Sequence, residues 1–358
     1  MKKTIILLAT TVIILTMLSC KSLNTFSNEN ILKNIKSAIL NTQKIYQRNV
    51  KKIFYIVNPN QDRDSDGFID AVEIAAGSNP EDASNTPISI PKVLADDSLT
   101  LWLDANNILG TSTVNKSNVG IDNGASISIW KDLSGNDNDA RAGLLSSDNN
   151  SSYEPILTKA SQNNKDVITF NGAKQFQIAD NLSLRVGSSD YSIFIVFKKN
   201  TGFDPLYLLT KGFAGGSGTL YKRYSLYAYS NKFKHEIDDD TYYKGEWAYN
   251  NYNKFKILYT ERNSIFDENI NTTALNTYID KGGKTPDASI DISHYGNLDE
   301  SPPQAMTIGG RTWGKSTSYC DFAEIIMFKK AMTVSERKEM FDYLTKKMGL
   351  KGKYRQRR

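Results

Sequence analysis

The sequence predicts an all-β sandwich over residues 94–350 of the 358-residue chain. Short runs in which apolar and polar residues alternate recur there, and clusters of Gly, Asn, Asp and Ser separate them. Closely spaced strands with turn signals between them are typical of sandwiches and barrels. A single all-β domain of about 250 residues has an ordinary length.

The expected strands share a length of six to twelve residues and a high content of apolar and aromatic side chains. They are LTLWLDA (99–105), SISIWKDL (126–133), DVITFNG (166–172), YSIFIVFKK (191–199), LYLLTKG (206–212), YSLYAYS (224–230), KFKHEI (232–237), KFKILYTE (254–261), ALNTYIDK (274–281), AMTIGG (305–310) and YCDFAEIIMFKK (319–330).

One helix is expected at the end of this domain. Thr333 and Glu336 have the spacing of a capping box, in which each side chain bonds the other residue's backbone N–H. Gly349 supplies a stop signal. The apolar positions of this helix are Val334, Phe341, Leu344 and Met348.

The composition excludes several classes of protein. Hydrophobic residues make up 39% of the chain, charged residues 23%, and the formal net charge is +5. A multi-span membrane protein would be more apolar, and a wholly disordered chain less so. The only dense basic run is the tail, residues 351–358, which we interpret as solvated. Without a clustered basic face, we expect no nucleic-acid partner.

The N-terminus has the pattern of an export signal. Lys2 and Lys3 precede an apolar run, Thr4–Leu18, that is shorter than the roughly 20 residues of a bilayer span. Ser19 and Cys20 then resemble the lipobox of bacterial lipoproteins, which implies cleavage after residues 1–19 and a lipid on the Cys20 thiol. Met17 and Leu18 depart from the commonest lipobox, so an ordinary signal with a chance cysteine is the alternative. Residues 20–30 then form a tether.

An amphipathic helix and a calcium loop follow. Apolar residues over 31–57 recur mostly three and four positions apart, and Pro59 ends the helix. The next stretch matches the loop D-x-D-x-D-G-x-x-D-x-x-E, whose alternate oxygens suit a hard cation. The expected ligands are Asp62, Asp64, Asp66, Phe68 through its carbonyl, Asp70 and Glu73.

Residues 58–86 resemble a thrombospondin type 3-like calcium repeat rather than a paired EF-hand. No second loop is visible, and Pro59 opposes an entering helix. The resemblance implies a cation-stiffened spacer. Residues 87–93 form a linker to the β domain.

The ends of the β domain resemble a LamG-type, concanavalin A-like jelly roll. The opening is carried by LWLDA (101–105), WKDLSGNDNDA (130–140) and ITFNG (168–172). The closing strand and helix are carried by IGGR (308–311) and DFAEIIMFKKAMTVSERKEMFDYL (321–344). The family implies two stacked antiparallel sheets that bind glycans or proteins, or in some branches cleave glycans.

The enzyme alternative rests on Glu236, Asp238 and Asp240, which resemble the E-I-D-x-E strand of laminarinase-type glucanases. There Glu236 would be the nucleophile, Asp238 the modulator and Asp240 the acid. This family has Glu at the last position and an apolar residue where Asp239 stands. The three consecutive acids are more typical of a turn after the strand.

The binding alternative rests on aromatic side chains. Alternation places Tyr224, Leu226 and Ala228 on the core face of their strand and Tyr227 and Tyr229 on the other face. A second cluster, which includes Tyr243 and Trp247, lies in a Gly- and Asn-rich stretch that we expect to be a loop. The candidate ligand-binding residues are Tyr227, Tyr229, Tyr243 and Trp247; cross-strand packing is the structural alternative.

The sequence therefore predicts an exported bacterial protein, anchored by lipid at the outer membrane or cell surface, with a periplasmic or secreted location as the alternative. A calcium-stabilised spacer would display a sandwich that binds a glycan or protein, as in adhesion. A glycan hydrolase and a structural surface component without a small ligand remain alternatives.

Overall fold

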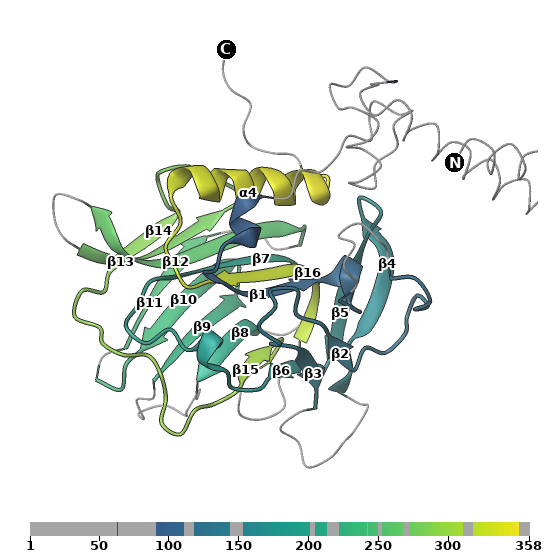
Figure 1. Cartoon of the computed structure of the whole chain (residues 1–358), viewed down its shortest axis with the longest axis horizontal. Coiled ribbons are helices and arrows are strands. Elements are labelled where there is room, and N and C mark those ends of the chain that lie inside the picture. Colours follow the sequence, from purple (N-terminus) through teal and green to yellow (C-terminus); the bar gives the residue numbers. More distant parts are fainter. Residues whose placement is uncertain are drawn as a thin grey trace, which may run out of the picture. The chain divides into compact units, whose positions relative to one another are not determined.

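The computed structural model describes residue 63 and residues 91–110, 118–143, 153–200, 205–212, 222–241, 243–249, 253–267, 272–310 and 318–350 (Figure 1). The chain divides into two compact units, Met1–Pro87 and Ile88–Arg358. The predicted signal peptide, tether, helix and tail lie outside the described residues, as does the calcium loop apart from Arg63. Among the described residues, no helix is both long and apolar enough to cross a bilayer.

Two antiparallel sheets form the second unit, which confirms the predicted sandwich. The first, sheet A, has the order β14-β13-β12-β7-β16-β5-β4, with β1 paired to β16. Its strands are β1 (Leu99–Asp104), β4 (Ile156–Gln162), β5 (Lys165–Gly172), β7 (Tyr191–Lys199), β12 (Lys256–Asp267), β13 (Thr272–Ile279), β14 (Ala288–Asp291) and β16 (Ser318–Phe328).

The second sheet, sheet B, has the order β11-β10-β9-β8-β15-β6-β3-β2. Its strands are β2 (Ile129–Trp130), β3 (Ala140–Ala142), β6 (Phe176–Ile178), β8 (Leu206–Gly212), β9 (Arg223–Tyr229), β10 (Lys232–Asp238), β11 (Tyr243–Tyr249) and β15 (Met306–Ile308). The short helices are η2 (Lys92–Ala95), η3 (Ala105–Asn107) and η5 (Leu182–Leu184), and the long one is α4 (Val334–Lys347).

Two apolar layers hold the unit together. The main core lies between the sheets, where Ile193 and Ile195 of β7 are fully buried. The neighbouring Phe194 and Val196 point to the other side of sheet A and join a second cluster with α4. Because both faces of β7 are covered, its sequence is continuously apolar rather than alternating.

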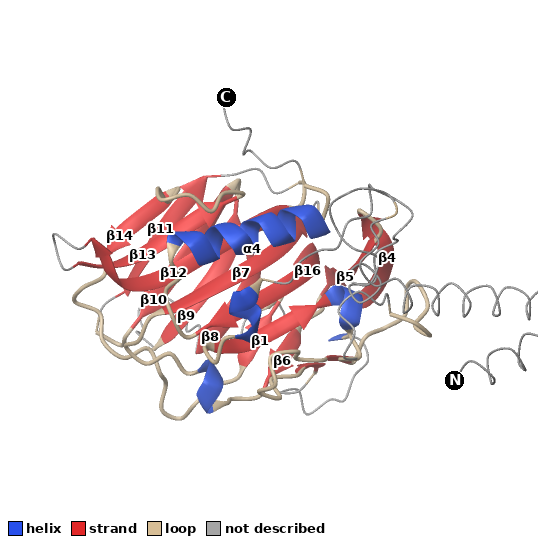
Figure 2. Cartoon of the chain, turned by 45° about the horizontal axis from the view of Figure 1, so that its top comes forward, coloured by secondary structure: helices blue, strands red, loops and turns tan. Residues whose placement is uncertain are grey.

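Helix α4 lies over the outer side of sheet A (Figure 2). Its capping box is formed as predicted: Thr333 accepts from the Glu336 backbone N–H, and Glu336 accepts from that of Thr333. The helix ends before Gly349, whose φ of +59° suits a residue without Cβ. Phe341 and Leu344 are buried, whereas Val334, expected on the apolar face, is 40% exposed because it occupies the first turn.

Buried ion pairs fix α4 to the sheet. The Lys347 Nζ lies 2.7 Å from Asp104 Oδ2 and 2.7 Å from Glu324 Oε2. One turn from the other end of the helix, the guanidinium of Arg337 lies 3.5 Å from Glu261 Oε1. Charges buried this deeply require partners, so these pairs specify where the helix docks.

The eleven predicted strands all occur, but the expectation of a loop around residues 242–252 is wrong. Tyr243–Tyr249 form β11, which pairs with β10 along its whole length. Strand β10 also continues one residue beyond the predicted end, to Asp238. Cross-strand hydrogen bonds therefore override the turn tendency of Gly and Asp here. Strands β3, β4, β6 and β14 were not expected.

Candidate ligand-binding face on sheet B

Strict alternation separates the two faces of β9 and β10. Tyr224, Leu226 and Ala228 are buried in the core between the sheets, as predicted. On β10, Phe233 and Ile237 do the same. His235 of β10 also points into the space between the sheets, and the remaining side chains of these strands point to the outer side of sheet B, which is the candidate face.

An aromatic row crosses this face in register. Backbone pairing places Tyr207 of β8 opposite Tyr227 of β9, and Tyr227 opposite Lys234 of β10. Lys234 is in turn opposite Trp247 of β11. These four residues, which we call the aromatic row, span three strand spacings, or about 14 Å.

The side chains of the aromatic row contact one another. The ring centroids of Tyr207 and Tyr227 are 5.2 Å apart, and those of Tyr227 and Trp247 are 5.6 Å apart with the planes at 85°. The Lys234 Nζ lies 5.3 Å from the Trp247 ring centroid and 5.8 Å from that of Tyr227. Edge-to-face and cation–π contacts thus hold the rings in fixed orientations.

Exposure increases toward one end of the row. Trp247 is 36% exposed and Tyr229, one step further along β9, is 49% exposed. Tyr207 and Tyr227 are half-buried. Tyr243 belongs to β11, opposite Asp238 in the backbone register. The structure therefore brings Tyr227 and Trp247 together and places Tyr229 on the same face.

A buried ion-pair cluster adjoins the row. Glu236 Oε1 lies 2.9 Å from Arg223 Nη2, while Oε2 lies 3.1 Å from Lys234 Nζ and accepts a 3.1 Å hydrogen bond from the Tyr227 hydroxyl. Gly245 makes this possible, because a Cβ there would lie 2.2 Å from Lys234 Cε. Charged donors and acceptors thus lie directly beside the rings.

The predicted acidic triad is only partly assembled. Glu236 and Asp238 share the outer face, as alternation requires, and Arg223 Nη2 also lies 3.9 Å from Asp238 Oδ2. Asp240 instead occupies the turn after β10, with φ of +74°, and its N–H donates to Asp238. Both Glu236 oxygens already have cationic partners, so this arrangement suits recognition of polar groups better than nucleophilic attack.

The polar run after Trp130 forms a turn held by its own side chains. The Asp132 carboxylate accepts from the backbone N–H groups of Trp102, Ser134 and Asn138. The Asp132 side chain therefore stabilises the turn. Among the described residues, no group of three or more His, Cys, Asp or Glu side chains could hold a metal ion.

Two further groups with chemical potential are buried in the core. The Cys320 thiol is fully buried, and burial raises its pKa well above its usual value. The His235 ring lies between the sheets, where it contacts the Tyr191 hydroxyl at 2.8 Å and the Thr260 hydroxyl. Burial lowers the pKa of His235 to about 3, so the ring is neutral and structural.

Sequence reasoning missed Tyr207, Lys234 and Arg223 as members of this face. Alternation within each strand indicates their outward direction. It does not indicate which residues lie opposite one another, because register depends on pairing between strands.

No protein-family model and no curated protein matches the chain. Several solved structures resemble it weakly. The binding domain of Paraclostridial Mosquitocidal Protein 1 has 12% identity and a TM-score of 0.46, over 69% of this chain and 52% of that one. The Botulinum neurotoxin serotype D binding domain has 13% identity and a TM-score of 0.45, over 69% and 51%.

The Trypanosoma rangeli sialidase in complex with sialic acid has 12% identity and a TM-score of 0.42, over 74% of this chain and 34% of that one. The chain thus matches about half the length of the first two structures. At these scores the fold assignment rests on the two sheets themselves, and the LamG-type resemblance stays a prediction.

Proposed function

We propose that this chain is an exported, lipid-anchored bacterial cell-envelope protein whose sandwich binds a glycan through the outer face of sheet B. One observation supports the glycan-binding site above all. The aromatic row is fixed in register across β8–β11, and Trp247 at its end is open to solvent. Exposed aromatic side chains beside charged and polar groups are typical of ligand sites.

The chemistry of the face fits a sugar chain. A pyranose presents C–H groups on its faces and hydroxyls on its edges. Trp247, Tyr227 and Tyr229 can pack against the C–H faces, and the tyrosine hydroxyls can bond the hydroxyls of the sugar. The buried Lys234–Glu236 pair holds the rings in place. The row, at about 14 Å, is long enough to contact more than one ring.

A glycan array probed with the full chain tests this proposal, with dissociation constants then measured for any glycan that binds. We expect Trp247→Ala and Tyr229→Ala each to weaken binding by roughly tenfold or more, since buried aromatic contacts dominate such interfaces. Leu182→Ala is the matched control, because Leu182 is 71% exposed and lies on η5, away from the row. Thermal unfolding confirms that each variant folds.

Equal binding by wild type and Trp247→Ala would refute this site. An array without any bound glycan would favour the protein ligand or the purely structural alternative. Hydrolysis of β-glucans that Glu236→Gln abolishes would establish the hydrolase alternative instead, since Glu236 and Asp238 share the face. We expect no such hydrolysis.

The lipid anchor is proposed from Ser19 and Cys20 at the end of the apolar run. We expect the mature wild-type chain to carry acyl chains on Cys20 and to sediment with membranes. A Cys20→Ser variant should lose both properties. Mass spectrometry of the N-terminal peptide makes this measurement, and an unmodified Cys20 would contradict the proposal. Asp is absent at position 21, which leaves outer-membrane delivery open.

The calcium spacer is proposed from the spacing of Asp62, Asp64, Asp66, Asp70 and Glu73. Chelation should increase protease cleavage within residues 58–86 and leave residues 94–350 intact. The variant Asp66→Asn should be cleaved to a similar extent with and without calcium. Equal cleavage of the wild-type chain in both conditions, or no heat of binding at millimolar Ca²⁺, would contradict a folded site.

A further inference from the structure

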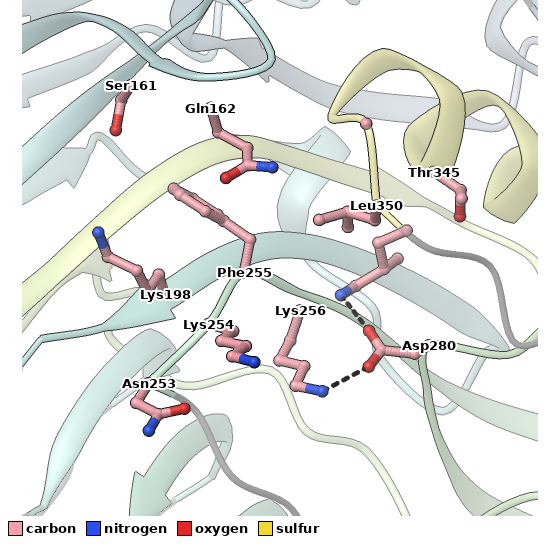
Figure 3. Close-up of a pocket in the computed structure, with 12 residues that line it drawn as sticks. Ser161, Gln162, Lys198, Asn253, Lys254, Phe255, Lys256, Asp280, Thr345 and Leu350 are labelled. Carbon is pink, nitrogen blue, oxygen red and sulfur yellow. Dashed lines mark hydrogen bonds and ion pairs between the residues drawn. The ribbon is translucent and has the colours of Figure 1, made fainter.

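A cavity of about 470 Å³ opens at one end of sheet A (Figure 3). The aromatic row, by contrast, lies on sheet B. Its lining comes from the ends of β4 and β7, the start of β12, the residue after β13 and the C-terminal end of α4. This volume is within the usual range of pockets for small ligands, roughly 300–1,000 Å³.

Cations dominate the charged groups of this cavity. Lys198, Lys254 and Lys256 line it, against one acidic residue, Asp280. Lys256 Nζ lies 2.8 Å from Asp280 Oδ2, and Lys198 Nζ lies 2.6 Å from Asp321 Oδ2. Within the described part of the chain, Lys254 is exposed and has no acidic partner. The cavity therefore has excess positive charge.

The walls are held in place by contacts that do not involve these lysines. Gln162 Nε2 donates to the Met348 carbonyl at 2.9 Å, and Asn163 Nδ2 donates to that of Lys347 at 3.1 Å. These bonds join the β4–β5 hairpin to the end of α4. They also satisfy carbonyls at the negative end of the helix, which would otherwise oppose an anion.

Uncharged groups complete the lining. The Ser161 and Thr345 hydroxyls and the Asn253 amide can bond hydroxyl groups. Phe255 contributes an aromatic ring, with Lys198 Nζ over it at 5.2 Å from its centroid. In Figure 3, Gln162 and Leu350 lie on one side of the cavity, and Lys254 and Lys256 lie on the other.

We propose that this cavity binds a sugar residue that carries a negative charge, as a carboxylate, sulfate or phosphate. The anionic group would contact Lys254 and share Lys256 with Asp280, while the sugar hydroxyls would contact the amide and hydroxyl groups. The two sources of this chemistry are an acidic polysaccharide and the phosphorylated sugar of a lipid headgroup. The site does not depend on the aromatic row.

Isothermal titration of the full chain with glucuronic acid, glucose 6-sulfate, glucose 6-phosphate, glucose and inorganic phosphate tests the proposal. We expect at least one of the three anionic sugars to bind and glucose to bind at least tenfold more weakly. Lys254→Glu should weaken anionic-sugar binding by about tenfold, since it inverts a charge at the contact. Added salt should weaken binding also.

Lys338→Glu is the matched control. Lys338 is exposed on α4 and does not line the cavity, so it makes the same charge change elsewhere. A second variant, Asp280→Asn, removes the competing acid and should strengthen binding severalfold. Thermal unfolding establishes that each variant folds. Trp247→Ala should leave this binding unchanged, which separates the site from the one on sheet B.

Several results would overturn the proposal. These are no binding of any anionic sugar, equal binding of glucose, inorganic phosphate binding as tightly as glucose 6-phosphate, or equal loss in Lys338→Glu and Lys254→Glu. If the anionic sugars bind as expected, oligouronides and vesicles that contain a phosphorylated glycolipid then distinguish the two sources.

Discussion

The ammonium group of Lys347 should contribute a large share of the stability of the sandwich. It is buried beneath α4 with the carboxylates of Asp104 and Glu324, and its Nζ also lies 3.2 Å from the Tyr343 hydroxyl. Burial opposes its charge, but the two carboxylates together hold the Lys347 pKa well above its usual value. A Lys347→Met substitution keeps much of the volume and removes the charge.

The magnitude follows from what the substitution leaves behind. Asp104 and Glu324, 0% and 1% exposed, would remain as two neighbouring carboxyl groups without a cation. Removing one partner of a buried ion pair costs about 3–5 kcal/mol. Since small domains unfold with only about 5–15 kcal/mol, this loss would be a large fraction of the total.

The loss should depend on pH. In the variant, Glu324 would lose its cationic partner, so its folded-state pKa, which burial already raises, would lie further above its unfolded value. The folded state would therefore bind more protons, and its destabilisation would be small at low pH and would grow as pH rises toward the folded-state values. We expect a loss of about 3–5 kcal/mol at pH 7.5 and clearly less at pH 4.5.

Guanidinium unfolding, followed by circular dichroism at both pH values, measures this effect. Lys346→Met is the control, because Lys346 is the adjacent residue of α4 and is exposed. A loss below about 1 kcal/mol at pH 7.5, or an equal loss at both pH values, would show that the ion pairs do not secure the helix.

Three further predictions concern stability and reactivity. In the wild-type protein, burial raises the pKa of Glu324 from 4.5 to about 7. The free energy of unfolding should therefore fall by up to ~3 kcal/mol as pH rises through this window. The urea concentration at the midpoint of unfolding should fall with it in the wild type and change less in Glu324→Gln. In a Cys20→Ser background, Cys320 should react with a thiol reagent only on unfolding, and a reaction at the rate of an exposed thiol would contradict its burial. Gly309→Ala should lower Tm by several degrees more than Gly124→Ala. Both glycines have positive φ, but only at Gly309 would a Cβ lie 2.4 Å from a core aromatic ring. Equal melting temperatures of the two variants would count against this packing.

Sequence patterns predicted the sandwich well where strands are long and buried. The alternation in YSLYAYS (224–230) gives the two faces of β9 correctly, and the apolar run in YSIFIVFKK (191–199) gives the central strand β7. The strands that were not expected lack this signal. β3 and β6 have three residues each, and β4 is only partly buried, so pairing with neighbours defines them rather than their composition.

For the candidate sites, too, the sequence predicted features within one strand but not contacts between strands. The outward direction of Tyr227 and Tyr229 follows from period-two geometry within one strand. The contact between Tyr227 and Trp247 requires knowing that β10 lies between their strands. The lysine cavity was beyond sequence reasoning, because its residues come from five segments that meet only in the folded chain.

The place of β16 in sheet A governs when this protein can fold. This last strand lies between β7 and β5 and also pairs with β1, so Leu101 is opposite Met327. The centre of the sheet is therefore absent until nearly the whole domain has left the ribosome. We expect the slow step of folding to be the closure of the very long loop between β1 and β16.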